Sequence, residues 1–227
     1  MSTAPDTRTL YLRDGYAHLG HLPNRTVVDD LTAEATRLYD QPPTRRELLT
    51  HPGTTALTME RMDAVERRSQ VFAQVLTDQA LVDTAAVFLG VGRARPAGAT
   101  LLCAPPRSPS PRLARLPRPD EDHHRTTSAR DDDLVHLWIP LPAQTLRVAF
   151  LSHLDPPPLL PLARLREALR RQAAGCGACD GDGFAVHPRL RVAMDENPGP
   201  DLRFGAVLTY RPSPEGHPLT TTAEVHR

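Results

Sequence analysis

The run DEDHH at 120–124 brings residue types that bind metals into one short stretch. Asp120, Asp122, His123 and His124 offer carboxylate oxygens and imidazole nitrogens, which are donors that divalent transition metals take in proteins. A run of this composition is equally typical of a solvated acidic loop. From the residues alone, both interpretations stay open.

A second spacing with possible chemistry is the C-x-x-C of Cys176 and Cys179. Only Cys103 accompanies this pair, so a structural zinc site would lack the second pair of ligands that it needs. The pair follows a predicted helix, whereas thioredoxin-like pairs lie where a strand meets a helix. We interpret the segment as a loop with reduced thiols.

The charge balance excludes some partners. The chain has 227 residues, with Lys plus Arg equal to Asp plus Glu at 27 each. A balanced chain gives no electrostatic reason to expect nucleic acid or a membrane surface as a partner. All of the basic residues are Arg, which excludes Schiff-base and P-loop lysine chemistry and, with 24 Pro, is typical of a GC-rich genome such as that of an actinomycete.

The sequence contains no targeting signal that we recognise. The first residues lack a charged region followed by an apolar stretch, and no stretch approaches the roughly 18 apolar residues of a membrane span. Three cysteines do not suggest a disulfide scaffold. We therefore expect a cytoplasmic protein.

The predicted elements that would position a site come in a clear order along the chain, with most helices before most strands. Helical spacing of Val28, Leu31, Ala35 and Leu38 predicts a helix from Asn24 to Tyr39, and periodicity returns from 67 to 89, before Gly90. Asp14-Gly15 predicts a turn into a short strand. Further strands are predicted at 99–104, 136–141, 146–152, 189–194 and 202–210. This order suits a β-sandwich or barrel with helices on one side.

Two stretches interrupt this pattern in what we expect to be a single domain over 1–227. Residues 105–133 are rich in proline and then in acidic residues, and predict a long loop. A helical insertion is predicted near 156–188, because the leucines at 162, 165 and 169 lie on one helix face. Both would be additions to the β domain.

Four segments, in chain order, carry a family resemblance: RDGYAHLGHL, LTDQALVDTAAVFLG, WIPL with LRVAFLSHL, and PGPDLRFGAVLTYRPSP. Together they cover most of the chain and resemble the phytanoyl-CoA dioxygenase family of Fe(II)/2-oxoglutarate oxygenases. The resemblance implies a mainly β fold with flanking helices, namely the double-stranded β-helix, which is jelly-roll or cupin-like.

The resemblance also implies a site in which two His and one carboxylate hold Fe(II). Asp120 occupies the carboxylate position, but Arg118 and Arg211 occupy the two histidine positions. A guanidinium has no lone pair to give a metal. We therefore expect neither metal nor cofactor, and take Arg118, Asp120 and Arg211 as candidate catalytic residues. The arginines would bind an anionic group, and Asp120 would orient one of them or transfer a proton. Erosion of a dead site would leave the same residues.

An alternative keeps Fe(II) and 2-oxoglutarate and moves the ligands. His217 is followed ten residues later by Arg227, which matches the family's spacing between its second His and the Arg that binds 2-oxoglutarate. Asp120 and His124 would then complete the metal site, with Arg227 as the cosubstrate residue.

A further candidate is the H-x-D of His153 and Asp155. It falls where the family's His is not a ligand, so we favour a packing role for His153.

Two functions follow from these readings. In the first, the chain belongs to bacterial natural-product metabolism and works without iron, as a tailoring enzyme or as a non-catalytic partner of another oxygenase. Its ligand would be a small, anionic biosynthetic intermediate. In the second, it is a conventional Fe(II)/2-oxoglutarate hydroxylase with relocated ligands. The sequence does not predict an oligomeric state.

Overall fold

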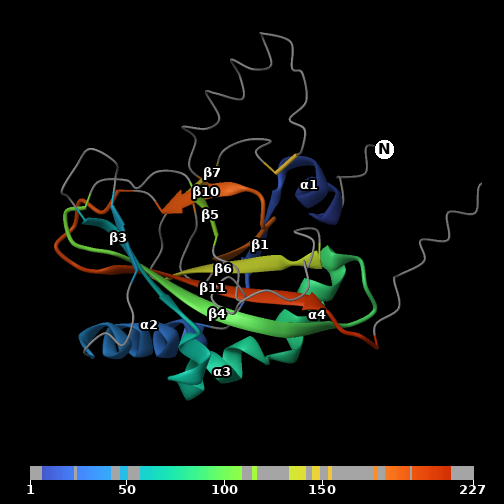
Figure 1. Ribbon diagram of the computed structural model, residues 1–227, viewed down its shortest axis with the longest axis horizontal. Coiled ribbons are helices and arrows are strands. Elements are labelled where there is room, and N and C mark those ends of the chain that lie inside the picture. Colours follow the sequence, from blue (N-terminus) through green and yellow to red (C-terminus); the bar gives the residue numbers. More distant parts are fainter. Residues whose placement is uncertain are drawn as a thin grey trace, which may run out of the picture.

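The computed structural model of the protein describes residues 7–22, 25–41, 47–50, 57–108, 114–116, 133–141, 145–148, 153–154, 176–177, 182–194 and 196–215. These residues form three layers, which are a small sheet, a large sheet and a set of helices (Figure 1). The large sheet lies between the other two layers.

All strand pairs in the two sheets are antiparallel. The large sheet has the order β1 (Tyr16–His21), β9 (Asp182–Val186), β6 (Val135–Leu141), β11 (Arg203–Pro212), β4 (Ala94–Ala104), β3 (Leu57–Asp63) and β2 (Glu47–Thr50). The small sheet has the order β5 (Ala114–Arg115), β10 (Arg191–Met194), β7 (Thr145–Val148) and β8 (Cys176–Gly177).

The helices lie mainly on the face of the large sheet that points away from the small sheet (Figure 1). They are α2 (Arg25–Asp40), the 3₁₀ turn η1 (Val65–Arg67), α3 (Gln70–Leu76) and α4 (Gln79–Leu89). The remaining helix, α1 (Thr7–Asp14), precedes β1 and contacts α4 through Tyr11 and Phe88, whose ring centroids are 5.1 Å apart.

Helix α2 forms where its apolar spacing predicted it. Val28, Leu31, Ala35 and Leu38 are all buried against the large sheet. Burying the Val28, Leu31 and Leu38 side chains contributes about 1.5–3 kcal/mol each, which exceeds what helix propensity alone supplies. The predicted helix is therefore confirmed, including its buried face.

The helical region predicted at 67–89 is two helices and not one. The side chain of Asp78 accepts hydrogen bonds from the backbone N–H groups of Ala80 and Leu81, so it caps a new helix at this position. Gly90 ends that helix in the left-handed conformation with φ 69°, as predicted.

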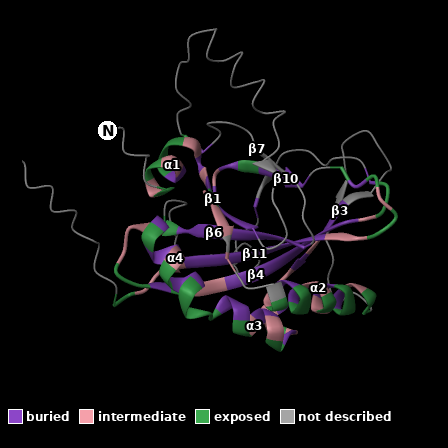
Figure 2. Ribbon diagram, turned by 180° about the vertical axis from the view of Figure 1, so that it is seen from behind, coloured by how far each residue is buried: buried purple, intermediate pink, exposed green. Residues whose placement is uncertain are grey.

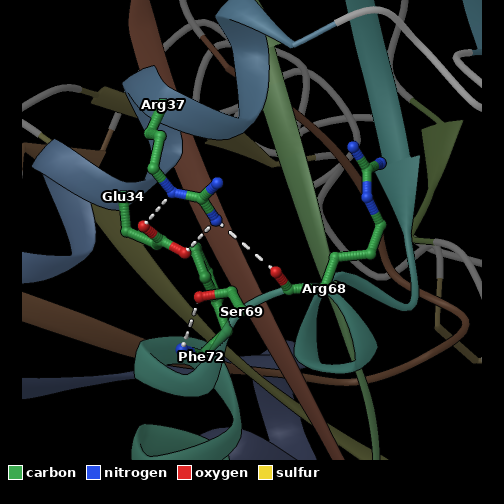
Figure 3. A network of polar contacts seen from close by, with 5 residues as sticks. All are labelled: Glu34, Arg37, Arg68, Ser69 and Phe72. Carbon is green, nitrogen blue, oxygen red and sulfur yellow. Dashed lines mark hydrogen bonds and ion pairs between the residues drawn. The ribbon is translucent and has the colours of Figure 1, made fainter.

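A polar network joins α2 to the start of α3 (Figure 3). The Arg37 guanidinium donates through Nε and Nη2 to the two carboxylate oxygens of Glu34, at 2.6 Å each, and reaches the Arg68 carbonyl at 3.4 Å. The Arg37 side chain, with a hydrogen bond from Ser69, lowers the pKa of Glu34. Ser69 also caps α3 by accepting from the Phe72 N–H at 3.2 Å. The network fixes the direction in which α3 leaves η1.

The central strands of the large sheet are mostly buried (Figure 2), and an apolar cluster lies on each of its two faces. The larger cluster lies between this sheet and the helices. The smaller cluster lies between the two sheets, and we call the side of the large sheet that faces it the inter-sheet face. Its buried members are Met59, Leu102, Ala104, Leu116, Trp138, Phe184, Val186, Leu190, Val192, Met194 and Val207.

Several elements differ from the sequence prediction. The predicted loop 105–133 contains β5, and the predicted insertion 156–188 contains β8 and β9, so part of each belongs to the β domain. Cys176 lies in β8 rather than in a loop. The weakly patterned stretch before 67 contains β2 and β3, and α1 was missed. The leucine-rich helix predicted at 159–172 lies outside the described residues.

In the described part of the chain, no single helix has the length and apolarity needed to cross a membrane. Helices α3 and α4 meet that requirement only when taken together across their 48° bend.

Candidate functional site

The inter-sheet face is built by cross-strand pairing in the large sheet. Successive residues of a strand point to opposite faces, so directly paired residues share a face. Phe184 pairs with Trp138, and Trp138 pairs with Val207. The rings of Trp138 and Phe184 are 5.7 Å apart between centroids. The centre of this face is therefore aromatic and aliphatic.

The small sheet adds apolar side chains to the same space. Val192 and Met194 of β10, with Leu190 just before it, belong to the inter-sheet cluster. Leu116, which follows β5, closes the cluster beside them. These side chains contain no nitrogen or oxygen that could bind a metal. Within the described ranges, no three His, Cys, Asp or Glu residues are grouped so that they could hold a metal ion.

Two pairs of polar side chains lie on the inter-sheet face. His136 and Thr209 are directly paired, and Nδ1 of the imidazole lies 2.9 Å from the Thr209 hydroxyl. Both residues are buried. His18, at the edge of the sheet, places its Nε2 3.2 Å from the Asp182 carboxylate and its ring against Phe184. A bulge between His18 and Gly20 brings this imidazole within reach of Asp182.

A third polar group lies on β3 and β4. The Arg61 guanidinium forms a fork with the Asp63 carboxylate, at 2.8–2.9 Å from Nε, and Thr100 donates to the same carboxylate at 2.9 Å. The Asp63 carboxylate therefore neutralises the charge of Arg61 locally. The described polar groups therefore surround the apolar centre instead of entering it.

Of the three candidate catalytic residues, Arg211 lies within the described residues. It lies at the end of β11, where it pairs with Arg95 of β4. Arg118 and Asp120 lie outside the described residues, so the structure does not test whether the predicted set comes together. Asp122, His123, His124, Asp155, His217 and Arg227 lie outside them as well.

His153 lies in a corner formed by α1 and β1, away from the polar pairs on the inter-sheet face. It is buried, with its Nε2 donating to the Leu12 carbonyl at 3.3 Å and its ring 5.5 Å from that of His187. Burial lowers the pKa of His153, although the hydrogen bond to Leu12 and the charge of Asp14 oppose this shift. This environment supports the packing role that we favoured for it.

Cys103 is buried in β4 and forms no disulfide. Cys176 lies in β8 and Cys179 lies outside the described residues, so the structure does not test their pairing.

The sequence analysis missed four residues that form the polar pairs of the inter-sheet face, namely His136, Thr209, His18 and Asp182. The sequence does mark His136 and Thr209, because each is a polar residue between apolar neighbours in or at the end of a predicted strand. Their proximity depends on the register between β6 and β11, which separates them by 73 positions in the chain. No local pattern carries that register.

No protein-family model matches the sequence, and no curated protein matches it. Solved structures do resemble it. The non-heme alpha ketoglutarate dependent epimerase SnoN from nogalamycin biosynthesis gives a TM-score of 0.65 at 17% identity, over 90% of this chain and 81% of that one. SnoN is also known in complex with Fe3+, alpha ketoglutarate and nogalamycin RO.

Two further structures are similar. The alpha ketoglutarate dependent carbocyclase SnoK, also from nogalamycin biosynthesis, gives a TM-score of 0.66 at 15% identity, over 92% of this chain and 84% of that one. HygX from Streptomyces hygroscopicus, solved with nickel and 2-oxoglutarate, gives a TM-score of 0.61 at 14% identity, over 93% of this chain and 88% of that one. The chain therefore has the jelly-roll fold of 2-oxoglutarate oxygenases, and the predicted double-stranded β-helix is confirmed. Membership of the phytanoyl-CoA dioxygenase family stays a prediction.

Proposed function

We propose that this chain acts on, or binds, a small biosynthetic intermediate without the iron site that its structural neighbours use. The intermediate is anionic, and the context is natural-product metabolism. The chain is either a metal-independent tailoring enzyme or a non-catalytic partner of another oxygenase.

The apolar centre of the inter-sheet space carries this proposal. Fe(II) in oxygenases of this kind takes imidazole nitrogen and carboxylate oxygen as ligands. His18, Asp182 and His136 carry such donors on the large sheet, but no three His, Cys, Asp or Glu among the described residues are grouped so that they could hold a metal ion. Leu190, Val192 and Met194, which face the space from the small sheet, supply none. The described residues therefore do not assemble an Fe(II) site, and we derive no step that requires it.

The biosynthetic context is supported by the neighbours. SnoN and SnoK come from nogalamycin biosynthesis, and HygX is known with hygromycin B bound. A shared fold alone does not fix a function, so the proposal for this chain rests also on its own arginines.

Arg118, Asp120 and Arg211 remain the proposed functional residues. A guanidinium binds a carboxylate or enolate in a planar fork, so Arg118 and Arg211 would hold the anionic group of the ligand. Asp120 would orient one of them or transfer a proton to or from the bound intermediate.

Anaerobic spectroscopy tests the proposal. The full chain is mixed with Fe(II) and 2-oxoglutarate, and the charge-transfer absorption of an iron–2-oxoglutarate complex and the release of succinate after oxygen is admitted are measured. We expect neither signal from protein whose circular dichroism shows intact folding. A clear absorption band with succinate release would overturn the proposal.

The alternative is a conventional Fe(II)/2-oxoglutarate hydroxylase, and it is favoured by the cofactors of SnoN and HygX. Its ligands would be Asp120, His124 and His217, with Arg227 for the cosubstrate. If a band appears, Asp120→Ala and His217→Ala should each abolish it, whereas His153→Ala should leave it unchanged.

A further inference from the structure

His18 and Asp182 form a carboxylate–imidazole pair at one edge of the large sheet. Strand β1 is the edge strand, and Nε2 of His18 lies 3.2 Å from the Asp182 carboxylate of β9. The two residues are 164 positions apart in the chain. The imidazole side chain is 48% exposed and the carboxylate side chain 13%, so a solute can reach the imidazole while the protein shields the carboxylate.

The sheet fixes the orientation of the imidazole. His18 pairs directly with Phe184, and their rings meet edge to face with centroids 5.1 Å apart. Phe184 pairs in turn with Trp138, and both of these rings are buried. Ala17, the neighbour of His18 along β1, belongs to the cluster under the helices, so His18 lies on the inter-sheet face. The imidazole is therefore the exposed end of an aromatic row whose other rings are buried.

A β-bulge sets the imidazole against the carboxylate. The pairing of β1 with β9 shifts from His18–Phe184 to Gly20–Gly183, which leaves Leu19 as an extra residue in β1. Gly20 takes the left-handed conformation, with φ 65°. Bulges re-aim side chains and are common beside active sites. A pair with so exposed a partner contributes little to folding, so stability alone does not explain this local geometry.

The carboxylate determines which nitrogen of His18 carries the proton. A carboxylate only accepts hydrogen bonds, so Nε2 is the donor in the neutral imidazole and Nδ1 holds the lone pair. Within the described part of the chain, no group forms a hydrogen bond with Nδ1. Enzymes use an imidazole oriented in this way to accept protons, because the carboxylate also stabilises the imidazolium that forms.

We propose that His18 is a catalytic base, positioned by Asp182, for a substrate with a C–H bond next to a carbonyl group. The step breaks this C–H bond, leaves its electron pair on the substrate as an enolate and places the proton on Nδ1 of His18. Return of the proton to the same or a conjugated carbon completes an epimerisation or isomerisation, which needs neither oxidant nor reductant. This proposal rests on the proposed function in its enzymatic form, because it names the reaction class of a metal-independent tailoring enzyme.

The elimination reaction of 5-nitrobenzisoxazole tests for this base. A base removes the C–H proton of the probe, the electron pair forms a nitrile, and the N–O bond breaks to give a coloured phenolate. The full chain is assayed with EDTA, and its rate is compared with that of free imidazole at the same concentration. We expect the chain to be at least about tenfold faster, which is less than the roughly hundredfold that a positioned base gives its own substrate.

Variants of the pair locate the base. His18→Gln should lower the rate to that of free imidazole or below. Asp182→Asn should lower it as far, because the Asn amide can donate to Nε2 and so leaves the proton on Nδ1. Asp182→Glu keeps the carboxylate and should recover part of the rate. His153→Gln is the control, since it removes a buried imidazole at the α1–β1 corner, and it should leave the rate unchanged.

A chemical test on the wild-type chain does not depend on how the variants fold. Diethyl pyrocarbonate modifies accessible imidazoles, and peptide mass spectrometry gives the labelled fraction of His18. The elimination rate should fall in proportion to that fraction. A wild-type rate no higher than that of imidazole, a full rate in folded His18→Gln or Asp182→Asn, or a full rate after complete labelling of His18 would overturn the proposal.

The two proposals fail separately. An iron–2-oxoglutarate band with succinate release would overturn the metal-independent function, and the probe would still show whether His18 acts as a base. A chain that does not accelerate the probe reaction would remove the catalytic role of His18 and leave the iron measurement as it was.

Discussion

Trp138 of β6 packs directly over Gly205 of β11, so closely that a Cβ atom added to Gly205 would overlap the indole Nε1. Trp138 is fully buried, and its ring also contacts Phe184. The absent side chain at Gly205 therefore gives the indole its place on the inter-sheet face. The large aromatic residue and the glycine form one packing unit at the centre of the barrel.

Gly205→Ala should destabilise the protein by about 1–3 kcal/mol, because the added methyl group must displace a rigid, buried ring. Urea unfolding followed by Trp138 fluorescence measures this change, since Trp138 is the single tryptophan of the chain. Gly199→Ala is the control, because its nearest contact would be an ordinary 3.5 Å. Equal stability of the two variants would contradict the packing.

Gly90→Ala should destabilise the C-terminal end of α4 by about 1 kcal/mol or more. Gly90 has φ 69°, and an added Cβ would also meet the Arg8 guanidinium of α1. Gly20→Ala separates the two effects, because Gly20 has φ 65° but open space around it. Gly90→Ala should have a lower unfolding temperature than Gly20→Ala. Adding Arg8→Ala to each variant should narrow the difference between their unfolding temperatures. An unchanged difference would mean that Arg8 does not contact this site.

Local patterns predicted much of the fold. The buried face of α2 follows from apolar residues at helical spacing, and β4, β6, β10 and β11 follow from apolar runs between turn signals. Gly90 ended a helix as expected. In each case the residues that determine the element are close together in the chain.

The remaining features depend on contacts between distant residues. The strand β9 has five residues, and two of them, Gly and Ala, have low strand propensity. Its pairing with β1 and β6 makes it a strand, and its composition alone does not predict one. Arg211 was a candidate from the sequence, but its position opposite Arg95 could not be predicted. Their pairing requires both the antiparallel register of β11 with β4 and the bulge at Ala97, and neither is a local property.

Asn197 should be the most sensitive polar residue between β10 and β11. It is buried, and its Nδ2 donates to the carbonyls of Ala104, Pro105 and Asp201 at 3.1, 3.1 and 2.7 Å. Asn197→Ala should lower the free energy of unfolding by about 1–3 kcal/mol, because buried carbonyls lose their donor.

Asn197→Asp should be worse than Asn197→Ala, because it sets a carboxylate against the same carbonyls. Ser108→Ala is the matched control, since the buried Ser108 hydroxyl has no hydrogen-bond partner among the described residues. Chemical denaturation of the three variants gives the order. A Ser108→Ala variant as unstable as Asn197→Ala would show that mere truncation in this loop, and not the loss of the amide, is responsible.

The buried His153 should make stability depend on pH. Its pKa is lowered in the folded protein, chiefly by burial, so in mildly acidic solution the unfolded chain binds more protons than the folded one. Stability is then fully present above the unfolded-state pKa of about 6.5, and is lost as the pH falls below that value toward the lower folded-state pKa. His153→Gln cannot titrate there and can still donate to the Leu12 carbonyl. Urea midpoints between about pH 7.5 and 5 should therefore fall more steeply for the wild-type chain than for His153→Gln, and parallel curves would show that His153 is not held neutral at the α1–β1 corner.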